Sequence, residues 1–135
     1  MMRIVCAVVL GLVPLMAPGW EQDAMTRLKD TQVCAGCDLS GADLRWANVY
    51  AAELGGAPNL VGADLSNANL SRANLYGANL EAAKLRGADL RGADLSWSSL
   101  IGADLTDALV EGARFDRAHF CQTTMPDGSI NKGRC

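Results

Sequence analysis

Residues 63–97 read ADLSN-ANLSR-ANLYG-ANLEA-AKLRG-ADLRG-ADLSW, seven blocks of five with leucine always in the third place. The same pattern extends outward to residues 37 and 122, which gives seventeen pentads with one extra residue between positions 55 and 59. The middle residue of every pentad is apolar, and alanine stands two places before it in fourteen of the seventeen. An internal repeat of this length determines the fold class more strongly than any single residue does.

A period of five fits neither regular element. Successive leucines would scatter around an α-helix, and on one long strand they would alternate between its faces. The pattern works if the chain turns a corner in each pentad, so that alanine and leucine point inward and the polar residue between them points outward. The second corner residue is often glycine, which suits a positive φ. These glycines are residues 41, 56, 62, 77, 87, 92, 102 and 112.

The run from Ala42-Asp43-Leu44 to Ala103-Asp104-Leu105 resembles the pentapeptide-repeat family, whose consensus is A-[D/N]-L-x-x. The resemblance covers residues 37–122 and implies an all-β solenoid, a right-handed quadrilateral β-helix with four pentads per coil and about four coils. The extra residue near Pro58 predicts a bulged corner or a small loop after the first coil.

The first residues predict export. Arg3 precedes an apolar stretch from Ile4 to Ala17, which contains Pro14 and is short for a membrane span. We therefore expect residues 1–19 to be a signal peptide cleaved after Gly19; a retained N-terminal anchor is the alternative. The protein would then be periplasmic or extracellular in a bacterium, with no membrane span after cleavage.

The ends of a solenoid expose unpaired edges and need caps. We predict an N-terminal cap over residues 20–36 with a short helix at 22–32, the repeat β-helix over 37–122, and a C-terminal cap over 123–135. The run Pro126-Asp127-Gly128 is typical of a turn within that last segment.

Four cysteines follow the predicted signal peptide, two at each end of the repeat. Disulfides suit an exported protein, so we predict Cys121–Cys135 across the C-terminal cap and, as a more strained ring, Cys34–Cys37. The alternatives are a redox role for the Cys-x-x-Cys pair and a zinc site. The distance between the two ends of the solenoid argues against a shared zinc ion.

No catalytic constellation is legible, and we expect no enzyme activity, cofactor or metal. His119 is the single histidine and falls on an outward position.

The coil geometry predicts columns of outward residues that follow one another at intervals of twenty. One column has acidic residues interrupted by Lys84, and another has an amide ladder between Asn59 and Asn79. Exposed apolar side chains are candidates for an interaction surface. They are Trp46, Trp97, Val61 and Ile101.

The chain has a formal net charge of −3, which becomes about −4 when the signal peptide with Arg3 is removed. This mild acidity argues against binding nucleic acid through phosphates, which needs a basic surface. We expect an exported, non-enzymatic scaffold or protein-interaction module whose partner the sequence does not name. The resemblance implies an alternative, because some family members mimic DNA and act on DNA topoisomerases; arginines such as Arg86 and Arg91 interrupt the acidity that such mimicry needs.

Overall fold

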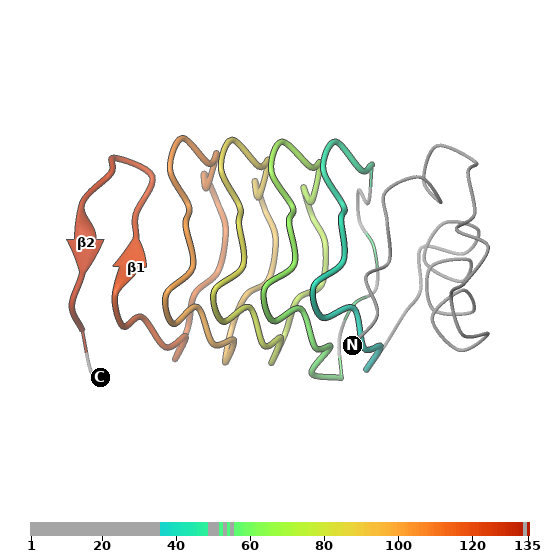
Figure 1. Cartoon of the computed structure of the whole chain (residues 1–135), viewed down its shortest axis with the longest axis horizontal. Coiled ribbons are helices and arrows are strands. Elements are labelled where there is room, and N and C mark those ends of the chain that lie inside the picture. The colour runs from blue at the N-terminus through green and yellow to red at the C-terminus, as the bar shows by residue number, and fades with distance from the viewer. Residues whose placement is uncertain (1–35, 49–51, 53, 55, 134) are drawn as a thin grey trace.

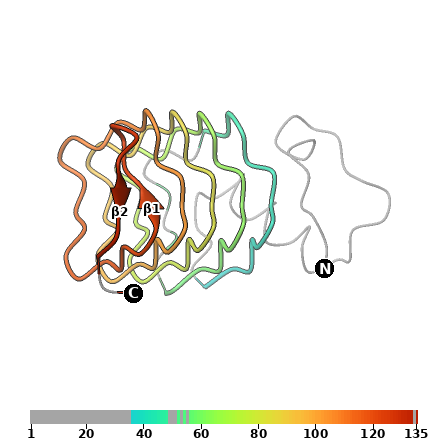
Figure 2. The ribbon, with the colours of Figure 1, turned by 60° about the vertical axis from the view of Figure 1, so that its left-hand side comes forward.

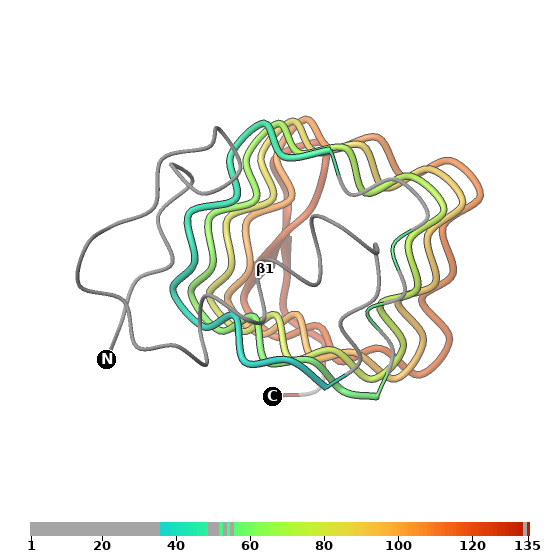
Figure 3. The same ribbon diagram turned by 90° about the vertical axis from the view of Figure 1, so that its right-hand side faces the viewer.

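The computed structural model describes residues 36–48, 52, 54, 56–133 and 135. The chain winds into a stack of four-sided coils (Figure 1), and successive coils overlie one another when seen along the long axis (Figure 3). The predicted β-solenoid is therefore confirmed for the described residues. The sides are very short, since each is held to the next coil through a single bridging residue.

Parallel bridges follow each side from coil to coil. One column runs from Asp38 through Asn59, Asn79 and Ser99 to His119, and the chain makes four turns along it. After the first turn each step is twenty residues, which is four pentads. The predicted count of about four coils agrees with this ladder.

The extra residue lies between Leu54 and Leu60. The Leu54 N–H donates to the carbonyl of Asn74, twenty residues on, whereas the Leu60 N–H donates to that of Asn79, nineteen residues on. Two successive residues, Gly56 and Ala57, have positive φ at this corner, whereas every other described corner has a single residue with positive φ. The insertion is thus absorbed as a bulged corner and the ladder continues undisturbed beyond it.

Most of the described corners are tight turns closed by a hydrogen bond from the N–H of the next alanine to the carbonyl of the preceding central residue. The Ala63 N–H, for example, donates to the Leu60 carbonyl at 3.0 Å. Ser98 donates in place of alanine at one corner, and Pro58, which follows the bulged corner, has no N–H to donate. The second corner residue has a φ near +60° whether or not it is glycine; it is +65° at Gly62 and +61° at Trp97. Such a φ is what type II turns require in their third residue.

The core is a column of stacked leucine and alanine along the axis. The leucines at the centres of the pentads from Leu39 to Leu105 are buried, and the alanines two places before them are buried with them. The last three centres, Val110, Phe115 and Phe120, are only partly buried, because no complete coil lies beyond them. Each buried leucine removes enough apolar surface from water to contribute about 2 kcal/mol.

The chain ends in a hairpin of two strands, β1 (Thr123–Thr124) and β2 (Ile130–Asn131), beside one part of the last coil (Figure 2). Strand β1 continues the coil ladder, since Thr124 bridges Asp104, and β2 pairs with it in antiparallel register. The predicted turn at 126–128 joins the two strands. Strand β2 thereby covers one edge of the solenoid.

The predicted signal peptide and the capping helix at 22–32 lie outside the described residues, so both stay predictions. In the described part of the chain, no helix is long and apolar enough to cross a membrane.

Candidate functional site

A groove of about 660 Å³ lies at the C-terminal end of the solenoid. Its lining comes from a corner, from the last side of the last coil and from the residues around β2. These residues are Trp97, Arg117, Ala118, His119, Phe120, Asn131 and Gly133. The coil geometry brings Trp97 and Arg117 together, because they occupy the same corner in consecutive coils.

Arg117 lies over the ring of Trp97, with its guanidinium carbon 4.9 Å from the ring centroid. Such stacking orients a cation without neutralising it. Within the described residues Arg117 forms no ion pair, whereas Arg45, Arg91, Arg86 and Arg114 each pair with an aspartate. The groove therefore contains an oriented positive charge that no carboxylate of the described chain neutralises.

A second, smaller hollow of about 370 Å³ follows the predicted acidic column. Asp43, Asp64 and Lys84 lie along it in consecutive coils, as the twenty-residue step predicts. The guanidinium of Arg45 lies 2.7 Å from the Asp43 carboxylate. The charges along this hollow compensate one another, and no group of three or more metal-ligating side chains forms among the described residues.

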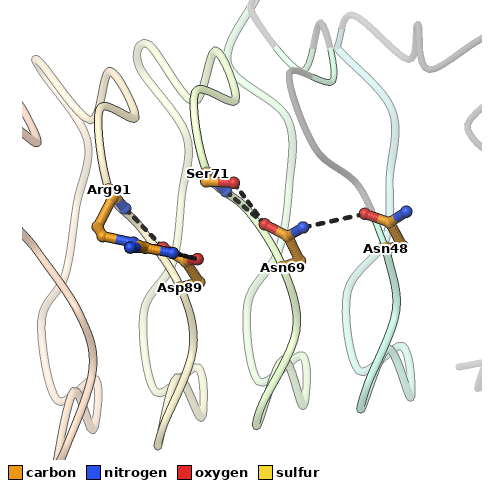
Figure 4. Close-up of polar contacts among 5 residues, drawn as sticks. All are labelled: Asn48, Asn69, Ser71, Asp89 and Arg91. Carbon is orange, nitrogen blue, oxygen red and sulfur yellow. Dashed lines mark hydrogen bonds and ion pairs between the residues drawn. The ribbon is translucent and has the colours of Figure 1, made fainter.

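The outward Asp and Asn residues have a structural task that the sequence pattern did not reveal. Their Oδ1 atoms accept a hydrogen bond from the backbone N–H two residues on, as between Asn69 and Ser71 and between Asp89 and Arg91 (Figure 4). These N–H groups belong to the first residue of each corner. The polar residue of the repeat therefore stabilises the turn that follows it.

The amide ladder predicted between Asn59 and Asn79 does not form. Each of these side chains instead accepts the N–H of its own corner, from Val61 and Glu81 respectively. An amide bond between coils occurs in the adjacent column, where Asn69 Nδ2 donates to Asn48 Oδ1 at 3.2 Å (Figure 4). The prediction was wrong in its residues, since the oxygens of Asn59 and Asn79 bond within their own corners and the amide bond between coils lies one column away.

The four apolar residues predicted as an interaction surface do not gather into one patch. Trp46 is 75 % exposed and Trp97 is 51 % exposed, but they occupy different corners. Val61 and Ile101 share a third corner, where Glu81 lies between them in the ladder. Of the four, only Trp97 lines the groove.

The structure joins Cys121 and Cys135 in a disulfide, with their Cα atoms 5.1 Å apart. This bond ties the end of the chain to the last coil next to the groove. Cys37 is also disulfide-bonded. Cys34, its expected partner, lies outside the described residues, so that pairing stays a prediction.

Several aspartates are held in the charged form, Asp89 and Asp104 among them. The guanidinium of Arg91 donates to both oxygens of Asp89, at 2.9 and 2.6 Å, and lowers the pKa of Asp89 below its usual 3.8. Burial raises the pKa of Asp104, but the hydrogen bonds from the hydroxyl and amide of Thr106 outweigh it, so that this pKa is lowered. Both groups belong to the side walls and face away from the core.

Comparison with known proteins identifies the family that has this architecture. A family model described as pentapeptide repeats matches residues 59–96 and 98–127, with eight copies. The chain belongs to the pentapeptide-repeat family. Members of this family fold as right-handed quadrilateral β-helices, and no curated protein matches the chain.

Solved structures of other pentapeptide-repeat proteins are similar to this one. HetL, involved in heterocyst differentiation regulation in the cyanobacterium Nostoc sp. strain PCC 7120, is 36% identical over 73% of this chain, with a TM-score of 0.53. The chain spans only 40% of the length of HetL. A protein of the Arabidopsis thaliana thylakoid lumen is 29% identical over 72% of this chain and 67% of its own, with a TM-score of 0.43. A variant of QnrB1, a plasmid-mediated fluoroquinolone resistance protein, is 22% identical over 69% of this chain and 58% of its own, with a TM-score of 0.35.

Sequence reasoning on this pentapeptide-repeat protein missed most of the groove. The sequence predicts only an outward position for His119; the residue is exposed, and it also lines the groove together with Arg117. The contact between Trp97 and Arg117 could have been predicted from the twenty-residue step between them, which places both at the same corner of consecutive coils. The contribution of Asn131 and Gly133 depends on how the hairpin folds back, and the repeat pattern holds no information on that.

Proposed function

We propose that this pentapeptide-repeat protein is an exported, non-enzymatic scaffold that binds another protein through the C-terminal groove. The observation that carries the proposal is the half-exposed indole of Trp97, held under the unpaired guanidinium of Arg117 in the wall of a large groove. Exposed aromatic and arginine side chains that border a hollow are typical anchors of protein interfaces. Export is supported by the apolar segment that follows Arg3.

A DNA-mimic role has less support in the side chains. The aspartates Asp43, Asp89 and Asp104 are each paired with an arginine on the same wall. Paired charges weaken the continuous negative field that imitation of a phosphate backbone requires.

The test is affinity purification from the exported fraction of the source cells, with the wild-type chain and with a Trp97→Ala variant. We expect the wild type to retain a protein that the variant loses. Tyr76→Ala is the matched control, since Tyr76 is also an exposed aromatic residue but does not line the groove. Recovery of the same proteins with all three chains, or absence of the chain from the exported fraction, would contradict the proposal.

A further inference from the structure

The groove borders an open edge of the β-helix. Within the stack, each outward residue makes two backbone bonds to the coil before it; His119 N–H donates to the Ser98 carbonyl and its own carbonyl accepts from Leu100 N–H, both at 2.9 Å. One coil later, the Ala118 carbonyl corresponds to the Ser98 carbonyl, and the Phe120 N–H corresponds to the Leu100 N–H. In the described part of the chain neither the Ala118 carbonyl nor the Phe120 N–H has a hydrogen-bond partner.

The strand that covers the edge elsewhere does not cover this side. Strands β1 and β2 extend the ladder beyond Asp104, on another side of the coil (Figure 2). Ala118 and Phe120 line the groove instead, together with Asn131 and Gly133, and Gly133 lies next to the Phe120 carbonyl. An unpaired edge that opens into a groove is suited to the addition of an extended peptide.

The inner part of this edge is apolar. Phe115 and Phe120 pack together with ring centroids 5.6 Å apart and are only partly buried at the end of the core. In each pentad the residues on either side of the bridging residue point inward. A peptide that continued the ladder would therefore place apolar side chains over these two rings.

The charge of the groove selects among such peptides. Arg117 is oriented by Trp97 and has no ion pair in the described chain, so a carboxylate from outside would be its first strong partner. A guanidinium and a carboxylate form charge-assisted hydrogen bonds of high directionality. The exposed His119 imidazole beside it lends no negative charge to the groove.

We infer that the groove binds an extended segment of a partner protein as one further strand on the side Ala118–Phe120. The segment carries an aspartate or glutamate that pairs with Arg117 and an apolar residue that packs on Phe120. This inference rests on the proposed function and names the class of partner and its mode of binding.

The test is selection of random twelve-residue peptides displayed on phage against the purified full chain. We expect the enriched peptides to combine an acidic residue with β-branched or aromatic residues. Synthetic copies should bind the Arg117→Ala variant about tenfold more weakly than wild type, because a charge-assisted bond is lost. Arg86→Ala is the matched control and should bind as wild type does, since Arg86 pairs with Asp104 away from the groove.

Amide hydrogen exchange distinguishes strand addition from other binding. The Phe120 N–H should exchange rapidly in the free chain and at least tenfold more slowly with a selected peptide bound, because the added strand accepts its hydrogen bond. The Leu100 N–H is the internal reference, since it is already bonded within the stack. A peptide methylated at its backbone nitrogens should lose this protection.

Three results would overturn the inference. One is a selection that enriches no acidic peptide; another is binding that survives Arg117→Ala or leaves Phe120 exchange unchanged. The third is protection of Phe120 without peptide together with a doubled mass in solution, which would assign the edge to a second copy of the chain. If affinity purification still recovers a Trp97-dependent partner in any of these cases, the proposed function stands and only this mode of binding fails.

Discussion

Individual residues at the corners adopt an unfavourable backbone conformation. Nine described non-glycine residues have positive φ, among them Trp46, Trp97 and Arg117. For L-residues this conformation costs about 1 to 2 kcal/mol, which glycine does not pay. The hydrogen bond that the preceding Asp or Asn accepts from the first N–H of the corner, as Asn79 does from Glu81, offsets part of that cost by holding the turn.

Ala82→Gly is therefore expected to stabilise the protein by about 1 kcal/mol, less the greater entropy of glycine in the unfolded chain. Ala82 is exposed at a corner with a φ of +55°, so that the substitution removes strain without opening the core. Urea denaturation measures the effect.

The neighbouring Ala83→Gly variant is the control. Ala83 is buried in the stack, and loss of its methyl group should destabilise the protein by about 1 kcal/mol. Equal losses of stability in the two variants would show that the corner at residue 82 is not strained.

The C-terminal hairpin is the element that ends the repeat. Strand β1 keeps the register of the coil, and the turn at 126–128 reverses the chain so that β2 pairs with β1. The disulfide then returns residue 135 to the last coil at Cys121. Two weak strands of two residues each are thus held by a covalent link.

Cys135→Ser should lower the free energy of unfolding by about 3 kcal/mol, the value expected for a loop of this size from chain entropy. The cysteines are separated by 14 residues, and the hairpin lies between them. Denaturation of the variant and of the wild type in parallel measures the difference.

Repeating both measurements with a reductant should remove the difference between the two chains. Detection of a free thiol at Cys121 in the unreduced wild-type protein, by alkylation and mass spectrometry, would show that the link does not form.

The whole molecule depends on the side walls as well as on the core. Asp89 and Asp104 have pKa values below the usual 3.8, so the unfolded chain binds more protons than the folded chain at acidic pH. Their stabilisation is fully present above pH 3.8 and is lost as the pH falls through the lowered values of the folded state. Acid therefore favours unfolding.

We expect the midpoint of thermal unfolding to be lower at pH 3 than at pH 6. Circular dichroism at both values measures it. Asp89→Asn keeps an oxygen for the Arg91 amide but cannot titrate, so its midpoint should fall less between the two pH values. An unchanged or higher midpoint at pH 3 in the wild type would contradict the sign of this effect.

Much of the architecture follows from the pentad alone. The inward Ala and Leu, the positive φ at corners such as Gly62 and the bulge near Pro58 are all local consequences of the pattern, because each pentad must bend and bury the same two side chains. Stacking then follows from the identity of the coils, since each coil contacts only its neighbours.

The groove depends on contacts that no single pentad contains. Arg117 meets Trp97 across one complete turn, and Asn131 and Gly133 reach the groove only because β2 folds back on β1. The apolar residues that looked alike in the chain, Trp46 and Trp97, lie at different corners of the square. The repeat determines the structure of each coil. The packing of the non-repeating C-terminal segment against the last coil determines which backbone groups and side chains stay exposed there.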